Sequence, residues 1–431
     1  MENLKYYNPK GMSGKEKSDY ITICHFTNEQ IDNEKSKSYK LGYEVFGALL
    51  VGMCQWLHQN FNQNNINNVY FLSRDGYILK KAYEILYPEN QVQYLYVSRK
   101  SLALPSMMGY SNLNEILEAM VLPPVFTIKE LLKCLDINCI EIEDIIKLCD
   151  INYDDIFYRK SFRFDAKLKK LISTIEPMLR EKITQQNDLF VNYLKQEHFE
   201  NKVAIVDIGW HNSIQKYFTK IIDNNKLDIE IHGYYIGVYN NAAKFDKGSE
   251  AKGFLYEYGD NMNIQYQTFA FVSLFESMFL AHEGTTLGYD YLNDQYIPVV
   301  AEYEYRDNQK IKNIIFEYQN GALQFVRDFK ENEVLSTMNL SPLVASKSLI
   351  NFGLNPQKED VEIFENVFFE NFSNNNMINY NHKFCYYITH LNILKEDFFK
   401  SGWRIMFLKR LIQVPFPHFL FFKILCKLFV K

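Results

Sequence analysis

The sequence predicts an α/β protein built on a mainly parallel β-sheet, and three observations support this. Short apolar runs rich in β-branched and aromatic residues recur along the chain, stretches with helical periodicity separate them, and three of the runs end in polar turns. Alternation of this kind is typical of parallel sheets, whose strands are joined by helical crossovers. Because ligands bind beyond the carboxyl ends of parallel strands, the polar turns are the expected place for chemistry.

Composition narrows the class of protein. Of 431 residues, 47% are hydrophobic and 16% aromatic, which excludes a disordered chain and is enough to bury a large core. A formal charge of −5 argues against a nucleic-acid partner. Seven scattered cysteines fit reduced thiols and a cytoplasmic location, and the polar start lacks the apolar run of a signal peptide.

The first elements follow a polar leader at residues 1–38. Residues 41–61 read as an apolar helix that belongs to the core, since polar residues interrupt it too often for a membrane span. Residues 69–72 read as a buried strand, 77–86 as an amphipathic helix and 91–97 as a second strand. Residues 39–111 are therefore the expected first part of the α/β core.

A helical insertion or cap is expected at residues 112–199. Thr127 and Glu130 form a capping box, and Phe126 and Leu131 fit a hydrophobic staple, so a helix should begin near Thr127. We expect this segment to cover a cleft.

The second part of the core is expected at residues 200–300, with strands at 202–208 and 231–239. A mostly helical region at 301–400 should follow. The whole predicts a Rossmann-like, mainly parallel sheet with a helical insertion and a mostly helical C-terminal region.

The tail, residues 401–431, differs in composition from the rest of the chain. From Gly402 onward it holds six Lys or Arg residues, seven aromatic residues and no acid. Such a segment fits a helix lying on an anionic membrane surface, and Pro415 and Pro417 should divide it into two short helices. The alternative is a tail that packs on its own domain or on a partner.

Three strand ends share one format and should face one pocket. They are FLSRDG at 71–76, YVSRKS at 96–101 and IVDIGWHNS at 205–213. Two carboxylates near basic and hydroxyl groups suit Mg²⁺ with a phosphate or pyrophosphate, because Mg²⁺ keeps several waters and needs only one or two carboxylates. Asp75 and Asp207 are the candidate metal ligands and catalytic groups, with His211 as a third catalytic candidate. The candidate binding residues of these turns are Ser73, Arg74, Gly76, Ser98, Arg99, Lys100, Gly209, Trp210 and Ser213.

A fourth segment, FESMFLAHEGTTLGY at 275–289, offers further candidates. Glu276 lies on a helix-like apolar stretch, and a polar turn containing His282, Glu283 and Thr285 follows it. Glu283 or His282 could act as general base, and the turn could hold phosphate or sugar hydroxyls. The sequence contains no HExxH, GxSxG, Walker or GxGxxG motif, which removes the best-defined metalloprotease, serine hydrolase, nucleoside-triphosphatase and dinucleotide-binding classes.

A purely structural role for the same residues is the competing interpretation. Asp75 or Ser73 could cap the helix that follows, and Arg74 could pair with an acid. Asp207 could cap its own following helix while Trp210 belongs to the core. Glu276 could be a buried carboxyl with its hydrogen bonds satisfied.

Five of these segments together resemble a bacterial family described as predicted haloacid-dehalogenase (HAD) superfamily hydrolases, found among surface-polysaccharide and glycosyltransferase genes. The matching pieces, in order within residues 40–290, are LGYEVFGALLVGMCQWL, FLSRDGYILKKAYE, YVSRKSLALP, VDIGWHNSIQKYF and FESMFLAHEGTTLGY. Members of that family commonly begin with a domain that carries an Asp-x-Asp nucleophile motif, and residues 1–68 have none. The chain thus resembles the second module alone. If SRDG were aligned with a nucleophile loop, Ser73 would replace the attacking aspartate.

The resemblance implies an enzyme that acts on a phosphorylated sugar or nucleotide sugar during capsule or lipopolysaccharide biosynthesis. It would be a HAD-like phosphohydrolase or a glycosyl or phosphoryl transferase. The basic aromatic tail favours a lipid-linked acceptor and a peripheral position at the inner face of the plasma membrane. The alternative is a noncatalytic scaffold that binds a sugar phosphate and recruits a glycosyltransferase partner.

Overall fold

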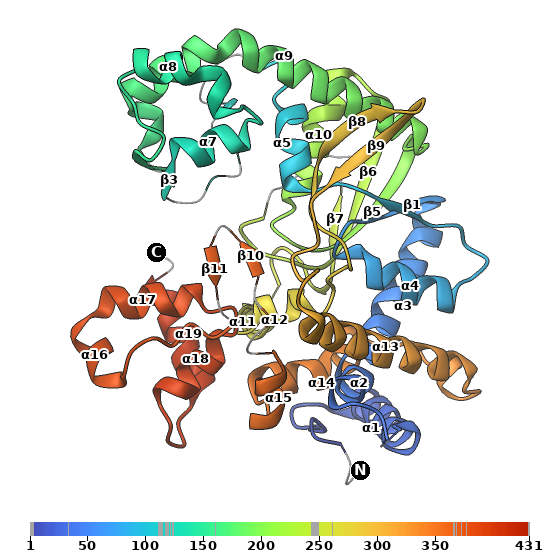
Figure 1. Ribbon diagram of the computed structural model, residues 1–431. Helices are drawn as coiled ribbons and strands as arrows, with labels where there is room; N and C mark the ends of the chain where they lie inside the picture. Colours follow the sequence, from blue (N-terminus) through green and yellow to red (C-terminus); the bar gives the residue numbers. More distant parts are fainter. Residues whose placement is uncertain are drawn as a thin grey trace.

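Five parallel strands form the central sheet of the protein, which we describe from a computed structural model (Figure 1). The structure describes residues 4–32, 34–110, 115–116, 120, 122, 125–159, 161–242, 250–260, 262–364, 367, 369–371, 373–375 and 377–429. The strand order is β2-β1-β5-β6-β7. The predicted Rossmann-like α/β architecture with a mainly parallel sheet is therefore confirmed.

The strands of this sheet differ in places from the predicted ranges. They are β1 (Asn68–Leu72), β2 (Gln93–Leu95), β5 (Asn201–Trp210), β6 (Ile229–Val238) and β7 (Ala251–Tyr256). The end predicted for β5 is wrong, because the strand continues through Gly209 and Trp210 instead of turning after residue 208. Two glycines allow this: a Cβ on Gly209, whose φ is +104°, would lie 2.3 Å from the carbonyl oxygen of Gly237 on β6.

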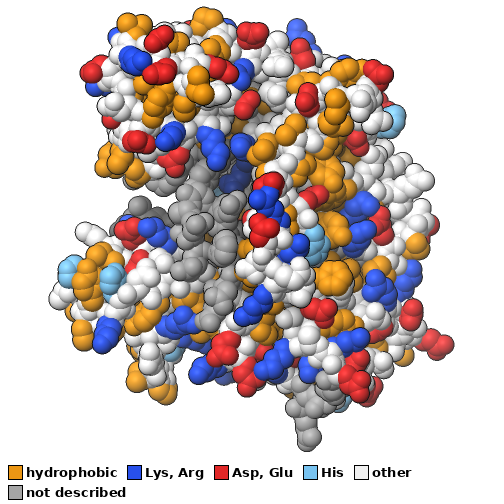
Figure 2. Space-filling model, in the orientation of Figure 1, with side chains coloured by type: hydrophobic (Ala, Val, Ile, Leu, Met, Phe, Trp, Pro, Cys, Tyr) orange, Lys and Arg blue, Asp and Glu red, His pale blue; other side chains and the backbone are white. Residues whose placement is uncertain are grey.

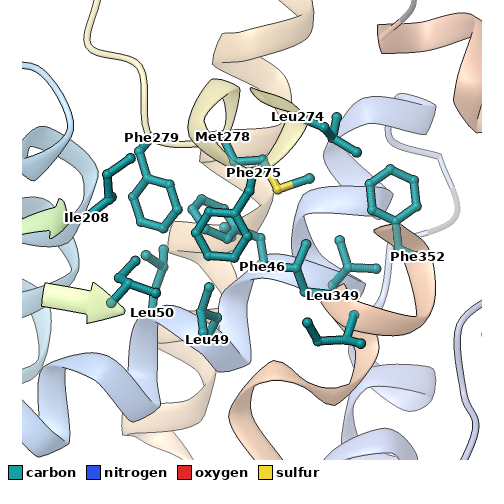
Figure 3. Packing of buried hydrophobic residues seen from close by; sticks show 14 of the residues in the cluster. Phe46, Leu49, Leu50, Ile208, Leu274, Phe275, Met278, Phe279, Leu349 and Phe352 are labelled. Carbon is teal, nitrogen blue, oxygen red and sulfur yellow. The ribbon is translucent and has the colours of Figure 1, made fainter. Parts of the chain in front are cut away.

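Both faces of the sheet are covered, as side-chain alternation along β1 and β5 requires. Val69 and Phe71 point into the larger cluster, together with Val206 and Ile208. The helices on this face are α3 (Gly47–Asn64), α4 (Gly76–Leu86), α12 (Val272–Ser277), α13 (Gln309–Glu331) and α14 (Pro342–Leu354). Figure 3 shows Phe46, Phe275 and Leu349 meeting at its centre. The predicted core helix at 41–61 is confirmed here as α2 (Lys37–Leu41), the π-helical turn η1 (Gly42–Phe46) and α3.

The opposite face packs Tyr70, Leu72 and Ile205 against a second cluster. Its helices are α5 (Arg99–Ser106), α9 (Ala166–Gln196) and α10 (Ser213–Asn225). An antiparallel hairpin, β8 (Thr286–Leu292) and β9 (Gln295–Val300), contacts α5 and α9. Tyr289 of this hairpin is buried between Phe190 and Tyr193 of α9.

The insertion forms a helical lobe at the upper left of Figure 1, with a hydrophobic cluster of its own. It contains β3 (Val125–Thr127), α7 (Ile128–Cys134), η2 (Cys139–Ile142), α8 (Glu143–Leu148), β4 (Ile156–Tyr158) and η3 (Phe162–Phe164). The predicted helix start is confirmed, since Thr127 and Glu130 cap α7 reciprocally. Helix α9 begins in this lobe and ends against the sheet, so it joins the two parts.

Helix α1 (Gly14–Gln30) lies below the sheet in Figure 1, and the last helices of the chain lie to its lower left. Helix α1 belongs to the polar leader and packs on α14. The remaining elements are α11 (Met262–Phe269), η4 (Leu335–Thr337), α15 (Lys358–Phe364), β10 (Phe369–Asn371), β11 (Ser373–Asn375), α16 (Phe384–Thr389), α17 (Leu391–Lys400), α18 (Arg404–Leu411) and α19 (His418–Phe429).

The tail forms two helices, α18 and α19, as the two prolines predict. Among the described residues, no helix combines the length and the apolar character that crossing a bilayer requires.

Candidate functional site

The turn after β1 places Asp75 at the start of α4 without using its side chain as a cap. Asp75 occupies the cap position, but its carboxylate accepts no capping hydrogen bond. Gly76 follows, where a Cβ would lie 3.0 Å from the backbone of Phe71, so the helix starts close against the strand. The Asp75 carboxyl group is thus available for a role other than helix capping.

Asp75 interacts with the carboxyl group of Asp207, which lies near the end of β5. Burial raises the pKa of Asp207 well above its usual range, and the charge of Asp75 raises it further. Burial also raises the pKa of Asp75, to about 6. Asp207 lies within the strand, and the cap position of α10 is held by Asn212, so Asp207 does not cap that helix either. Two strand-end acids therefore lie near each other, as the predicted convergence of the turns requires.

A third carboxyl group, that of Glu276 on α12, belongs to the same group of charges. Burial and the charge of Asp75 raise the pKa of Glu276 to about 7. Its Oε1 accepts a hydrogen bond of 3.0 Å from the indole Nε1 of Trp210. Trp210 itself is buried among Tyr239, Tyr256 and Phe275. The interpretation of Trp210 as a core residue is confirmed, although its N–H group positions an acid of the site.

Arg99, the first residue of α5, supplies positive charge to this acidic group. Its guanidinium lowers the pKa of Asp75, Asp207 and Glu276 alike, against the larger effect of burial. We call Asp75, Asp207, Glu276 and Arg99 the carboxylate site. Three acids held partly desolvated near one another are stabilised by a proton, a metal ion or a cationic ligand.

Further basic residues surround Arg99, and two of them come from the insertion. The charge of Lys133 on α7 acts on Lys100, whose pKa is lowered first by burial. Arg159 and Arg99 both act on Tyr217 of α10. Figure 2 shows Lys and Arg side chains on the upper side of a hollow between the insertion and the C-terminal lobe, which contains α16 to α19. We give the name basic rim to Arg99, Lys100, Lys133 and Arg159, the residues connected by these electrostatic interactions.

Arg74 is engaged in an ion pair. Its Nη1 lies 2.7 Å from both carboxylate oxygens of Glu304, whose side chain is only 7% exposed. This is the structural interpretation offered above for Arg74, and Glu304 is its acid. A phosphate could reach Arg74 only in competition with this pair.

The serines of the first two turns make structural hydrogen bonds. Ser73 Oγ donates to the carbonyl oxygen of Val97, 2.9 Å away. Ser98 forms a reciprocal capping box with Ser101 at the start of α5, and its Oγ donates to the carbonyl oxygen of Thr286. These bonds tie β1, β2 and the hairpin together and set the position of Arg99.

The third turn places the His211 ring beside Tyr239, with part of the side chain exposed. Desolvation and the charge of Arg99 lower the pKa of His211, so the ring lies near the carboxylate site and favours its neutral form. Ser213 begins α10 and is half-buried, while Gly209 permits the close approach of β5 to β6.

The polar turn of the fourth segment forms a patch beside the carboxylate site, whereas Glu276 of the same segment belongs to that site. Tyr94 donates a 2.5 Å hydrogen bond to Glu283. Burial raises the pKa of Tyr94, and the hydrogen bond to Glu283 and the charge of Asp75 raise it further. The His282 ring contacts Tyr77, and burial lowers the pKa of His282. The carbonyl oxygen of Thr285 accepts a hydrogen bond from Ala301 N. Tyr94 thus interacts with both Glu283 and Asp75.

Sequence reasoning missed several residues near the site. Glu304 follows the β8–β9 hairpin, and Lys133 and Arg159 lie in the insertion. Arg404 was grouped with the basic residues of the tail, but it is half-buried, stacks on Phe269 at 4.2 Å and contributes its charge to Glu276. No local pattern marks these four, because each reaches the site through the tertiary fold.

The donor set fits a magnesium ion bound by two carboxylates. Asp75 and Asp207 offer oxygen ligands, and waters and substrate oxygens commonly complete such a site. Within the part of the chain that the structure describes, no group of three or more His, Cys, Asp or Glu side chains is arranged to hold a metal. Beside the two carboxylates, waters and substrate oxygens would complete the coordination of an ion bound here.

A separate groove of about 790 Å³ lies at the opposite edge of the sheet. It is lined by residues at the amino ends of β1 and β2, among them Asn68 and Gln93, and by Glu84 near the end of α4. Since ligands of parallel sheets bind beyond the carboxyl ends, the groove does not compete with the carboxylate site as the centre of chemistry.

No protein-family profile matches this chain, and none of the curated proteins is significantly similar to it in sequence.

Proposed function

We propose that the protein is an enzyme acting on a phosphorylated sugar or a nucleotide sugar, with the reaction at the carboxylate site. The observation that carries the proposal is the placing of Asp75 and Asp207, two partly desolvated carboxyls, at the carboxyl ends of adjacent strands beside Arg99. Carboxyl groups whose pKa is strongly shifted by burial and by a nearby charge are candidates for a functional role. The resemblance to surface-polysaccharide proteins supports the choice of substrate.

In this proposal, two groups of charged residues have different roles. Asp75 and Asp207 would hold Mg²⁺, which supplies a Lewis acid for a phosphoryl oxygen when it is bound. The basic rim would hold the remaining phosphate charge, and Lys133 and Arg159 would connect the insertion to the substrate. Glu276, fixed by Trp210, would accept or return a proton.

The test is turnover of purified protein with Mg²⁺ and a panel of sugar phosphates and nucleotide sugars, followed by release of phosphate and of nucleotide. Asp75→Asn and Asp207→Asn should each lower kcat/KM by about a hundredfold or more. Asp223→Asn, at an exposed position of α10, is the matched control and should not change it. Folded aspartate variants that retain full turnover would overturn the proposal.

The products separate the two reaction types. Phosphate release that needs no acceptor identifies a hydrolase, and nucleotide release that needs an acceptor identifies a transferase. Lys133→Ala and Arg159→Ala should raise KM more than they lower kcat, because both residues are assigned to binding.

One observation favours a noncatalytic scaffold as the second candidate. Arg74, a predicted phosphate ligand, forms an ion pair with Glu304, so its charge stabilises the fold instead of binding phosphate. A protein of this kind would bind sugar phosphates without turning them over. In a thermal-shift assay, a sugar phosphate would raise the melting temperature of such a protein. The turnover assay with sugar phosphates and nucleotide sugars would yield no product.

A further inference from the structure

The outer face of α19 carries an apolar stripe on the molecular surface. Leu420, Ile424 and Leu428 are spaced four residues apart and are 54%, 46% and 63% exposed. Residues at this spacing lie on one side of a helix. A helix that packs on a globular domain normally turns polar residues outward, so an outward stripe of Leu and Ile needs an explanation.

The inner face of the same helix is already packed. Phe422 is fully buried and lies against Phe269 of α11 and Phe398 of α17. Leu425 and Cys426 are buried beside it. The tail therefore does pack on its own domain, and the stripe is apolar surface left over after that packing.

The segment before α19 adds to this surface. Val414 and Phe416, between α18 and α19, are 62% and 40% exposed. We call these two residues and the stripe the tail surface. Across residues 384–428 lie nine of the 23 large hydrophobic side chains that are exposed in the described part of the chain, so apolar exposure is concentrated in the C-terminal lobe.

Basic residues flank the tail surface, and acids are lacking in this part of the sequence. Lys427 is exposed on α19, and the Lys423 ammonium lies 5.2 Å from the Phe419 ring centre. The sequence from Gly402 to the end has six basic residues and no acid. Figure 2 shows Lys or Arg side chains beside hydrophobic ones over the C-terminal lobe. A neutral apolar partner surface would give these charges no counterpart, and a polar acidic one would give none to the apolar stripe. An anionic lipid surface offers a counterpart to both.

We infer that the tail surface docks the protein on an anionic lipid bilayer. With 12 residues, α19 is too short to span a bilayer, so it lies in the plane of the interface. Leu420, Ile424 and Leu428 enter the boundary between headgroups and acyl chains, and Lys423 and Lys427 meet the lipid phosphates. The inference is independent of the reaction proposed above.

The test uses the full chain and vesicles of phosphatidylcholine with or without phosphatidylglycerol, in a sedimentation assay. We expect binding to the anionic vesicles only, weakening as salt is raised. The triple variant Leu420→Ser/Ile424→Ser/Leu428→Ser should weaken binding at least about tenfold. The charge variant Lys423→Glu/Lys427→Glu should weaken it by a similar factor.

Matched controls carry the same chemical changes elsewhere. Ile140→Ser/Leu148→Ser/Ile156→Ser alters three exposed aliphatic residues of the insertion, and Lys15→Glu/Lys17→Glu alters two exposed lysines of α1. Both should bind like the unaltered protein. An unchanged melting temperature in every variant separates loss of docking from loss of folding.

Two results would overturn the inference. One is equal binding by the stripe variant and its control. The other is a protein that ignores anionic vesicles but forms a dimer in analytical ultracentrifugation, which the stripe variant converts to a monomer. That second result would assign the tail surface to a contact between two copies of the chain.

Discussion

Carboxyl groups whose pKa is raised by burial have different surroundings in different parts of the described structure. Asp75, Asp207 and Glu276 interact electrostatically beside Arg99. Glu44, in η1 on the far side of the core, instead accepts a 2.6 Å hydrogen bond from the backbone N–H of Tyr6. Glu44 is not assigned to the site. A substitution at this position therefore measures the effect of a buried carboxyl group on the free energy of unfolding, without a change to the site.

Glu44→Gln should stabilise the protein at alkaline pH. Burial raises the pKa of Glu44 to about 7. Between pH 4.5, the ordinary value, and about 7, the folded state keeps a proton that the unfolded state loses, so the unaltered protein loses stability as pH rises through this window. Glutamine keeps the acceptor for Tyr6 without the charge, and the variant should gain about 1–3 kcal/mol at pH 8.

Urea unfolding at pH 5 and pH 8 measures this effect. The gain should be present at pH 8 and small at pH 5, and Glu29→Gln, at an exposed position of α1, should show no gain at either. A gain of equal size at both pH values would mean that Glu44 is not protonated in the folded protein.

At this scale the sequence predicted the candidate site side chains, but not their partners. Asp75, Asp207 and Arg99 were predicted because acids and bases follow apolar runs, and strand ends of a parallel sheet share one edge. That Arg74 would pair with Glu304, or that Arg404 would lie near Glu276, depends on contacts between segments more than 100 residues apart. Local patterns carry no information about such contacts.

Helix α13 crosses the segment formed by α2 and η1 with very little space between the backbones. A Cβ on Gly42 would lie 1.8 Å from the carbonyl oxygen of Tyr318, and one on Gly321 would lie 2.0 Å from that of Tyr39. Two glycines thus let the backbones approach each other directly, and the groups nearest to them are carbonyls that cannot move aside.

Gly42→Ala should therefore destabilise the protein by at least about 3 kcal/mol, because one methyl group must displace backbone on both helices. Denaturant unfolding gives the free energy. Lys310→Ala, at an exposed position of α13, should change it by no more than about 0.5 kcal/mol. A tolerated Gly42→Ala would show that the two helices can separate without cost.

Helices and the strands β1, β5 and β6 were easier to predict than the hairpin and the edge strand β7. Strands β1, β5 and β6 are apolar runs, and their prediction is confirmed, but β7 and the β8–β9 hairpin were missed. The hairpin had a signal: Asn293 and Asp294, with φ of 51° and 61°, form a two-residue turn between alternating residues. Strand β7 had none, because AKGFLY is short and has no clear alternation.

On the scale of the whole molecule, the insertion has a core separate from those of the sheet. Residues such as Phe126, Leu131 and Ile172 pack only within that lobe's cluster. Smaller clusters open at lower free energy than the global core. Helix α9 spans both regions, since its first part packs in the lobe and its last turns pack on the sheet.

Hydrogen exchange should divide α9 accordingly. Amides of α7, α8 and the first half of α9 should exchange faster than those of β1, β5 and the last turns of α9. Phe126→Ala should lower protection in the lobe by about 3 kcal/mol or more and leave β5 unchanged. Loss of protection in β5 to the same extent would show that the lobe and the sheet open as one unit.

The strand order has a consequence for the growing chain. Val69 of β1 pairs with Ala204 of β5, which is made 135 residues later (204 − 69), whereas its other neighbour, β2, follows at once. At the usual pace of translation, β1 stays unpaired along one side for on the order of ten seconds. During that time one edge of an apolar strand is open to other chains, so the ribosome-bound protein is a natural client for chaperones until β5 emerges.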